Sequence, residues 1–189
     1  MKRLLSSLAL AVASLASLAV APFASATVLT FDDISSDDFV PANYGGLDWS
    51  AGDWFAFGDA QAPFTAHSGS MRITSGFGDA DAATAIGLGA GETFQGAWFA
   101  GYEDVSVKFE LYEHGALVAT SSTLATSATP TWLASGYGGL VDEVIVSSAD
   151  QGGFVLDDLT FSAAVPEPGS TALRACGLLA LVAIARRRA

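Results

Sequence analysis

Residues 105–118 read Val-Ser-Val-Lys-Phe-Glu-Leu-Tyr-Glu-His-Gly-Ala-Leu-Val, and this stretch decides the fold class. Apolar residues occupy every second position from Val105 to Leu111, and polar or amphipathic residues lie between them. Because successive side chains of a strand point to opposite faces, the pattern predicts a β-strand over 105–112 with one face in the core. The pair His114-Gly115 then offers a tight turn into the next apolar residues, so we predict a β-hairpin here.

The same rhythm extends through residues 27–163. Short apolar runs alternate with turn residues about every ten positions, and no stretch of this region has the period of a helix. We therefore predict an all-β domain, a jelly-roll-like β-sandwich, because no blade-length repeat of a propeller is present. The other predicted strands are 28–32, 54–57, 71–75, 83–87, 93–99, 116–123, 131–134, 143–147 and 154–161.

The N-terminal segment, residues 1–26, has the composition of a secretory signal peptide. Lys2 and Arg3 precede an apolar run over 4–20, and Ala24 and Ala26 frame a small-residue cleavage site. We expect signal peptidase and the general export machinery to handle this segment, so that the mature chain begins at Thr27. The domain would then lie outside the cytoplasm.

The C-terminal segment, residues 164–189, has the composition of a membrane-sorting tail. Its apolar run over 169–185 is 17 residues long, roughly 25 Å as a helix, which is just enough for a single membrane helix. Prolines make the preceding spacer extended and accessible. The positive-inside rule places the terminal arginines in the cytoplasm: Arg186, Arg187 and Arg188.

This tail resembles the PEP-CTERM sorting signal of exported bacterial proteins. The resemblance is carried by the spacer Val165, Pro166, Glu167 and Pro168, the apolar run and the arginine cluster. It implies that an exosortase, a membrane-embedded cysteine protease, recognises the Pro-Glu-Pro core and cuts near it. It also implies that the arginines 186–188 act as the stop-transfer cluster. The domain would then pass from the membrane to the cell surface or the exopolysaccharide matrix. Residues 29–33, 44–49, 93–99 and 154–161 are likewise similar to a recurrent extracellular domain found before such tails.

The charge of the domain excludes some classes of partner. Between residues 27 and 163 the basic residues are Arg72 and Lys108 against nineteen acidic ones, a formal net charge of −17. Nucleic acid is therefore excluded as a partner, because phosphate would be repelled. The domain contains no cysteine, so disulfides do not stabilise it.

Two acidic pairs raise the question of a metal. Asp32-Asp33 and Asp157-Asp158 occur in similar apolar contexts near the two ends of the domain. In a sandwich whose first and last strands pair, these aspartates would lie close together. Structural Ca²⁺ would neutralise the repulsion between them, because it takes six to eight oxygen ligands. The alternative is that water alone solvates the carboxylates. No cofactor is required by any motif in the chain.

The sequence allows several classes of function for the domain: a glycan-binding module, a structural protein or a hydrolase. The aromatic residues could stack on sugar rings, with the segment 48–57 and its Trp49, Trp54 and Phe55 as candidate glycan-binding residues. A purely structural matrix protein without a ligand is the alternative. A glycan-active hydrolase needs only two acids at the right distance. However, the chain has two histidines and no nucleophile elbow, so we predict no catalytic residue and no enzyme.

Overall fold

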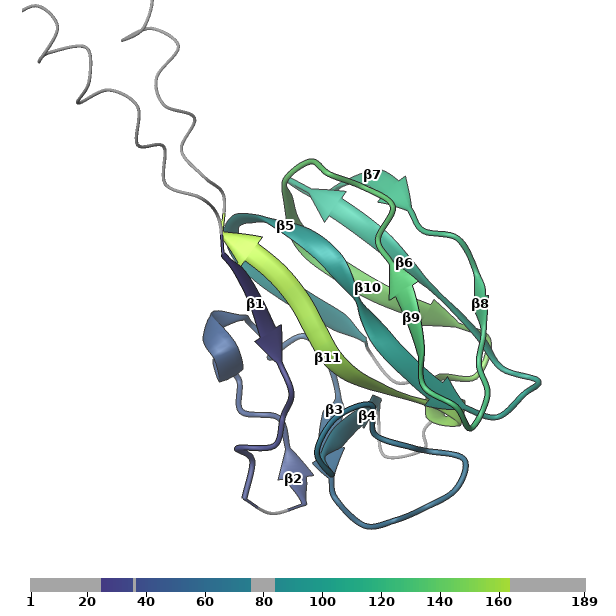
Figure 1. The fold of residues 1–189 in the computed structure, drawn as a ribbon. Helices are drawn as coiled ribbons and strands as arrows, with labels where there is room; N and C mark the ends of the chain where they lie inside the picture. Colours follow the sequence, from purple (N-terminus) through teal and green to yellow (C-terminus); the bar gives the residue numbers. More distant parts are fainter. Residues whose placement is uncertain (1–24, 36, 76–83, 164–189) are drawn as a thin grey trace, which may run out of the picture. The chain divides into compact units, whose positions relative to one another are not determined.

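The computed structural model describes residues 25–35, 37–75 and 84–163 (Figure 1). Residues 25–164 form one compact unit. The predicted sorting tail and most of the predicted signal peptide, including Ala24, lie outside the described residues; Ala26 is the first residue of strand β1. Within the described ranges, no helix is long and apolar enough to cross a membrane.

The domain is an all-β, antiparallel, sandwich-like fold, which confirms the predicted class. Its strands are β1 (Ala26–Leu29), β2 (Asp38–Phe39), β3 (Trp54–Phe57), β4 (Arg72–Ser75), β5 (Ala85–Gly101), β6 (Ser106–Glu113), β7 (Ala116–Thr120), β8 (Leu124–Ala125), β9 (Thr131–Ala134), β10 (Val141–Ser148) and β11 (Phe154–Ala163). Short 3₁₀ turns occur at η1 (Tyr44–Gly46) and η3 (Gln151–Gly153).

The hairpin predicted at His114-Gly115 is confirmed. Strands β6 and β7 pair with Glu113 opposite Ala116. His114 and Gly115 both have positive φ, 52° and 73°, the backbone of a type I′ turn, whose twist matches the twist of the flanking strands.

Strand β5 differs from the prediction of two separate strands at 83–87 and 93–99. It runs without interruption from Ala85 to Gly101, and Gly89 and Gly91, with φ of 72° and 81°, lie in its middle. Its first half pairs with β10, whereas its second half pairs with β11 on one side and β9 on the other. The glycines let one strand change course and serve both layers of the sandwich.

The core forms where the sheet folds back on itself. The sheet order is β2-β3-β4-β11-β5-β10-β6-β7, so the second half of β5 and β6 are not neighbours in the sheet. Even so, Phe109 of β6 lies 4.8 Å from Phe94 and 5.5 Å from Phe99, measured between ring centroids. Contact without strand pairing means that these strands face each other across the apolar interior. The first and last strands, β1 and β11, pair with Leu29 opposite Leu159.

Candidate functional site

One row of side chains crosses five strands on the face turned away from the main core. The strand register places Phe57 opposite Arg72 and Trp98 opposite both Asp157 and Trp132. Leu156 pairs with Ile73, which brings Asp157 beside Arg72. We call these five residues the outer row. Their chain neighbours, such as Ala97, Phe99 and Leu156, are in the core, because strand side chains alternate between faces.

The loop between β3 and β4, residues 58–71, is fastened to Asp157 from across the sequence. The carboxylate of Asp157 accepts backbone N–H bonds from His67 at 2.7 Å and Ser68 at 2.9 Å on one oxygen. Its other oxygen accepts the N–H of Asp158 at 2.7 Å. The Asp157 side chain is thereby buried, with 2% of the residue exposed. A single buried carboxylate thus positions a loop nearly ninety residues away in the chain.

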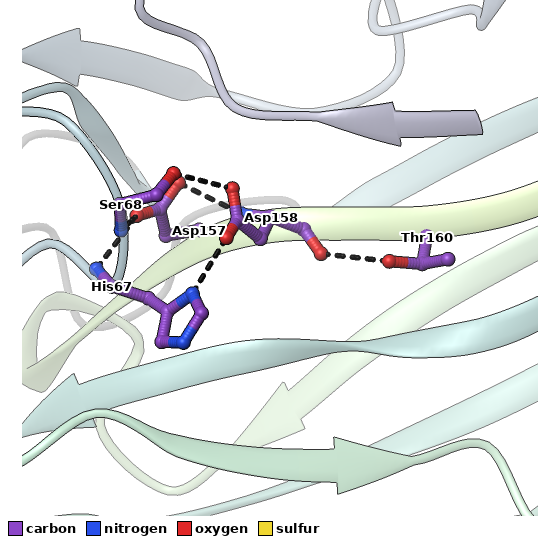
Figure 2. Close-up of polar contacts among 5 residues, drawn as sticks. All are labelled: His67, Ser68, Asp157, Asp158 and Thr160. Atoms are coloured by element: carbon purple, nitrogen blue, oxygen red, sulfur yellow. Dashed lines mark hydrogen bonds and ion pairs between the residues drawn. The ribbon is translucent and has the colours of Figure 1, made fainter. Parts of the chain in front are cut away.

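Asp158 binds the side chains of the same two loop residues (Figure 2). It accepts a hydrogen bond from the Ser68 hydroxyl at 2.7 Å, and its other oxygen lies 2.6 Å from His67 Nδ1. Two consecutive residues of a regular strand would point to opposite faces. Here Asp158 has φ of 47° and the register shifts after Asp157, so this irregularity turns both carboxylates toward one loop.

The imidazole of His67 lies flat on one face of Trp98. The ring centroids are 3.6 Å apart and the planes differ by 10°. Trp98 in turn contacts Trp132 of β9, with centroids 5.9 Å apart and an angle of 61° between the planes. Gly96 permits this close approach of β9, because a Cβ at this position would lie 2.2 Å from the carbonyl oxygen of Leu133. Both tryptophans are half-buried, so part of each ring remains accessible.

Arg72 is buried at the other end of the row. Its guanidinium donates to the carbonyl oxygens of Phe57 at 3.1 Å and Ser70 at 3.0 Å, and also to that of Asp59. It lies 3.9 Å from the centroid of the Phe57 ring, a cation–π contact. Burial lowers the pKa of Arg72, and the charges of Asp37, Asp59 and Asp157 oppose that shift. The guanidinium is therefore held by carbonyl groups and not by a carboxylate in an ion pair. Because Ser70 and Asp59 belong to the loop 58–71, these bonds also fix that loop.

Burial raises the pKa of Asp157 to about 6 from an ordinary value of 3.8, although the N–H groups that it accepts act against the shift. The folded state then holds this proton more tightly than the unfolded chain does. The free energy of unfolding is therefore expected to fall as the pH rises from about 4 to about 6, and to level off above. The contribution of Asp157 is at most about 3 kcal/mol, at 1.36 kcal/mol per unit.

Urea unfolding across this pH range measures the effect. The control is Asp157→Asn, which cannot ionise at this position and should lose this part of the pH dependence. A variant with the same fall as the wild type would show that Asp157 is not responsible.

The four aspartates predicted as calcium ligands are occupied by donors of the protein itself. Asp32 accepts the N–H groups of Ser70 at 2.9 Å and Met71 at 3.0 Å, and Asp33 accepts the hydroxyl of Tyr44. Among the described residues, no three of these carboxylates converge as ligands for one ion. Calcium would have to displace these N–H and O–H groups, so structural Ca²⁺ stays a prediction to be tested.

The prediction of glycan-binding aromatics in the segment 48–57 is wrong for two residues. Trp49 and Trp54 are 2% and 1% exposed and pack edge to face in the core. Their rings fill the interior because an apolar surface of this size is most stable away from water. Phe55 is half-buried and packs on Phe39 with centroids 5.5 Å apart. The accessible tryptophans are instead Trp98 and Trp132.

The cluster of His67, Ser68 and Asp158 was not predicted from the sequence. Its geometry can be compared with that of a catalytic triad. A Ser-His-Asp triad requires the serine hydroxyl to bond the imidazole nitrogen that the aspartate does not hold. Here the hydroxyl of Ser68 bonds Asp158 instead, so serine and histidine share one carboxylate. This arrangement fixes the loop and orients the ring of His67 on Trp98; it does not activate Ser68 as a nucleophile.

No protein-family model and no curated protein matches the chain. Among solved structures, it is similar to variants of a family 29 carbohydrate-binding module. One variant is 16% identical, with a TM-score of 0.40, over 74% of this chain and 93% of the other. Another, complexed with cellulohexaose, is 15% identical, with a TM-score of 0.39, over 74% and 91%.

Proposed function

We propose that this domain is a non-catalytic carbohydrate-binding module of jelly-roll type, carried by a protein that is exported to the cell surface or the exopolysaccharide matrix. The observation that carries the proposal is the Trp98–Trp132 pair. These two half-buried rings lie side by side on neighbouring strands, outside the core, at the end of the outer row.

The physical basis is the stacking of sugar rings on aromatic rings. A pyranose presents an apolar face of C–H groups, and tryptophan buries a large area of such a face. The rings of Trp98 and Trp132 are set at 61°, so they form two walls rather than one flat platform. His67 covers part of Trp98 and is in turn fixed by Asp158, so the site is rigid before a ligand arrives. Rigidity of this kind lowers the entropic cost of binding.

Charge favours an uncharged polysaccharide as the ligand. The domain carries a net charge of −17, which repels anionic polymers. The segment from Gly115 to Val141, which contains β9 and Trp132, contains no Asp, Glu, Lys or Arg. Strand β9 therefore places no ionised side chain next to Trp132, so a neutral sugar that stacks there displaces no charged group of this strand.

The test is a binding assay of the purified full chain in mild detergent against immobilised neutral polysaccharides, with and without Ca²⁺. Trp132→Ala is expected to weaken binding at least about tenfold, because one stacked ring contributes on the order of 1.4 kcal/mol. Phe39→Ala is the matched control, since Phe39 is 58% exposed on the distant edge strand β2 and should leave binding unchanged.

Two results would count against the proposal. Equal binding by the wild type and Trp132→Ala would remove the tryptophan site. No binding by the wild type to any neutral polysaccharide would favour the alternative, a purely structural matrix protein. A rise in thermal stability with Ca²⁺ would support the predicted calcium at the four aspartates, and no rise would remove it.

The proposed route to the surface rests on the sequence of the two ends. A cationic start and a small-residue cleavage site support export, and the Pro-Glu-Pro spacer with its arginine cluster supports processing by an exosortase. Replacing Pro166, Glu167 and Pro168 by alanine is expected to leave the full-length, anchored chain in the membrane fraction, as followed by immunoblot. Release of the domain at the wild-type rate from this variant would contradict exosortase recognition.

A further inference from the structure

Three potential metal ligands converge at the end of the β6–β7 hairpin. Glu113 is the last residue of β6, His114 begins the turn, and Asp142 lies at the start of the neighbouring strand β10 (Figure 1). One ligand atom from each side chain lies within 4.8 Å of the others. The sequence alone places Asp142 far from the hairpin, so only the pairing of β10 with β6 brings the three residues together.

The backbone holds this group in place. His114 has the left-handed conformation of a type I′ turn, and its N–H donates to a carboxylate oxygen of Asp142 at 2.7 Å. Strands β10 and β6 pair in a regular register from Glu143 opposite Tyr112 onward, which places the preceding Asp142 across from Glu113. The position of Asp142 thus depends on the turn and on the register of β10 with β6, both of which are part of the sheet.

The two carboxylates of this group are not neutralised by a lysine or an arginine of the described residues. Oxygen Oε2 of Glu113 is buried and has no hydrogen-bond partner there. Its other oxygen lies 3.3 Å from Nδ1 of His114. A buried carboxylate oxygen without a partner is costly, and a bound cation would satisfy it.

We propose that Glu113, His114 and Asp142 bind a divalent transition-metal ion of the Zn²⁺ type. An imidazole nitrogen with two carboxylates suits such ions better than Ca²⁺ or Mg²⁺, which prefer oxygen ligands alone. Bonds of about 2.0–2.2 Å to a tetrahedral ion place ligand atoms roughly 3.4 Å apart. The Glu113–His114 distance already matches this, and the His114 side chain, 87% exposed, is free to rotate toward Asp142. Three ligands leave a coordination position open for water or a further ligand.

The test is calorimetric titration of the full chain, in mild detergent, with Zn²⁺ in a large excess of Mg²⁺, which saturates unspecific carboxylate binding. We expect one ion per chain. The variant His114→Asn removes the nitrogen ligand but retains the turn, because Asn-Gly is the preferred type I′ pair. It should lose Zn²⁺ affinity at least about tenfold, with an unchanged melting temperature without metal. Glu113→Gln should show a similar loss.

The control is His67→Asn, which removes the other histidine of the chain and should bind Zn²⁺ like the wild type. Loss of binding in His67→Asn with retention in His114→Asn would place the ion elsewhere and overturn the proposal. Full displacement of Zn²⁺ by Mg²⁺, or no saturable binding by the wild type, would overturn it as well. None of these outcomes depends on binding of polysaccharide.

Discussion

Replacement of Phe109 by alanine is expected to lower the free energy of unfolding by about 3–5 kcal/mol. Phe109 is completely buried in the middle of β6 and contacts Phe94 and Phe99 of the facing strand β5. The variant loses the apolar surface of the ring and leaves a cavity that rigid, strand-borne neighbours cannot fill. Urea or thermal unfolding of the purified chain gives the measurement.

Phe39→Ala is the control for the loss of a phenylalanine ring as such. Phe39 is 58% exposed and contacts only the edge of Phe55 among the aromatic rings of the described residues. Its removal should cost less than about 1 kcal/mol. A cost for Phe109→Ala as small as that for Phe39→Ala would show that the two layers do not pack through this ring.

Asp157→Ala is expected to destabilise the domain by about 2–3 kcal/mol and to release the loop at 58–71. Three N–H groups, those of His67, Ser68 and Asp158, lose their acceptor in this variant. Unpaired donors near the protein interior cost about 1–3 kcal/mol each, but part of this is offset because the variant no longer holds a poorly hydrated carboxylate. The loss should be larger at pH 5 than at pH 7, since burial raises the pKa of Asp157 to about 6 and its charge opposes folding only when it is ionised.

Hydrogen exchange of the loop amides separates this anchoring from a general loss of stability. In Asp157→Ala the amides of His67 and Ser68 should exchange much faster than those of the core strands. Asp150→Ala is the matched control, because Asp150 is an exposed aspartate that accepts a single N–H bond from Gly152 at 3.1 Å; it should cost about 1 kcal/mol or less. Unchanged exchange at His67 in Asp157→Ala would contradict the anchoring role.

Sequence patterns predicted the strands well wherever alternation is regular. Strands β3 and β9 have the predicted bounds, 54–57 and 131–134, and the hairpin at His114-Gly115 forms with the expected turn. The two-residue strands β2 and β8 were missed, because two residues are too short for a period to be seen. Strand β5 was predicted in two parts, because glycines that break a strand and glycines that bend one are alike in the sequence.

The candidate site was predicted much less well. Trp54 and Trp98 both lie in predicted strands and are both followed by a phenylalanine, yet Trp54 is 1% exposed and Trp98 is half-buried. Alternation tells that adjacent residues face opposite ways, but not which face meets the second layer. The contacts of His67 with Asp158 and of His114 with Asp142 span 91 and 28 positions, and no local pattern reports such distances.

The sequence by itself determined the all-β class, the turn of the β6–β7 hairpin and the strongly acidic charge of the domain, because strand alternation, turn backbone and charge are local properties of residues. It also supplies the only basis for the predicted export signal and sorting tail. The tertiary structure decided which tryptophans are accessible, how Asp157 and Asp158 hold the loop, and which acids gather at His114. These depend on strand register, on a bulge and on the folding of one sheet over itself, which arise only when distant segments pair.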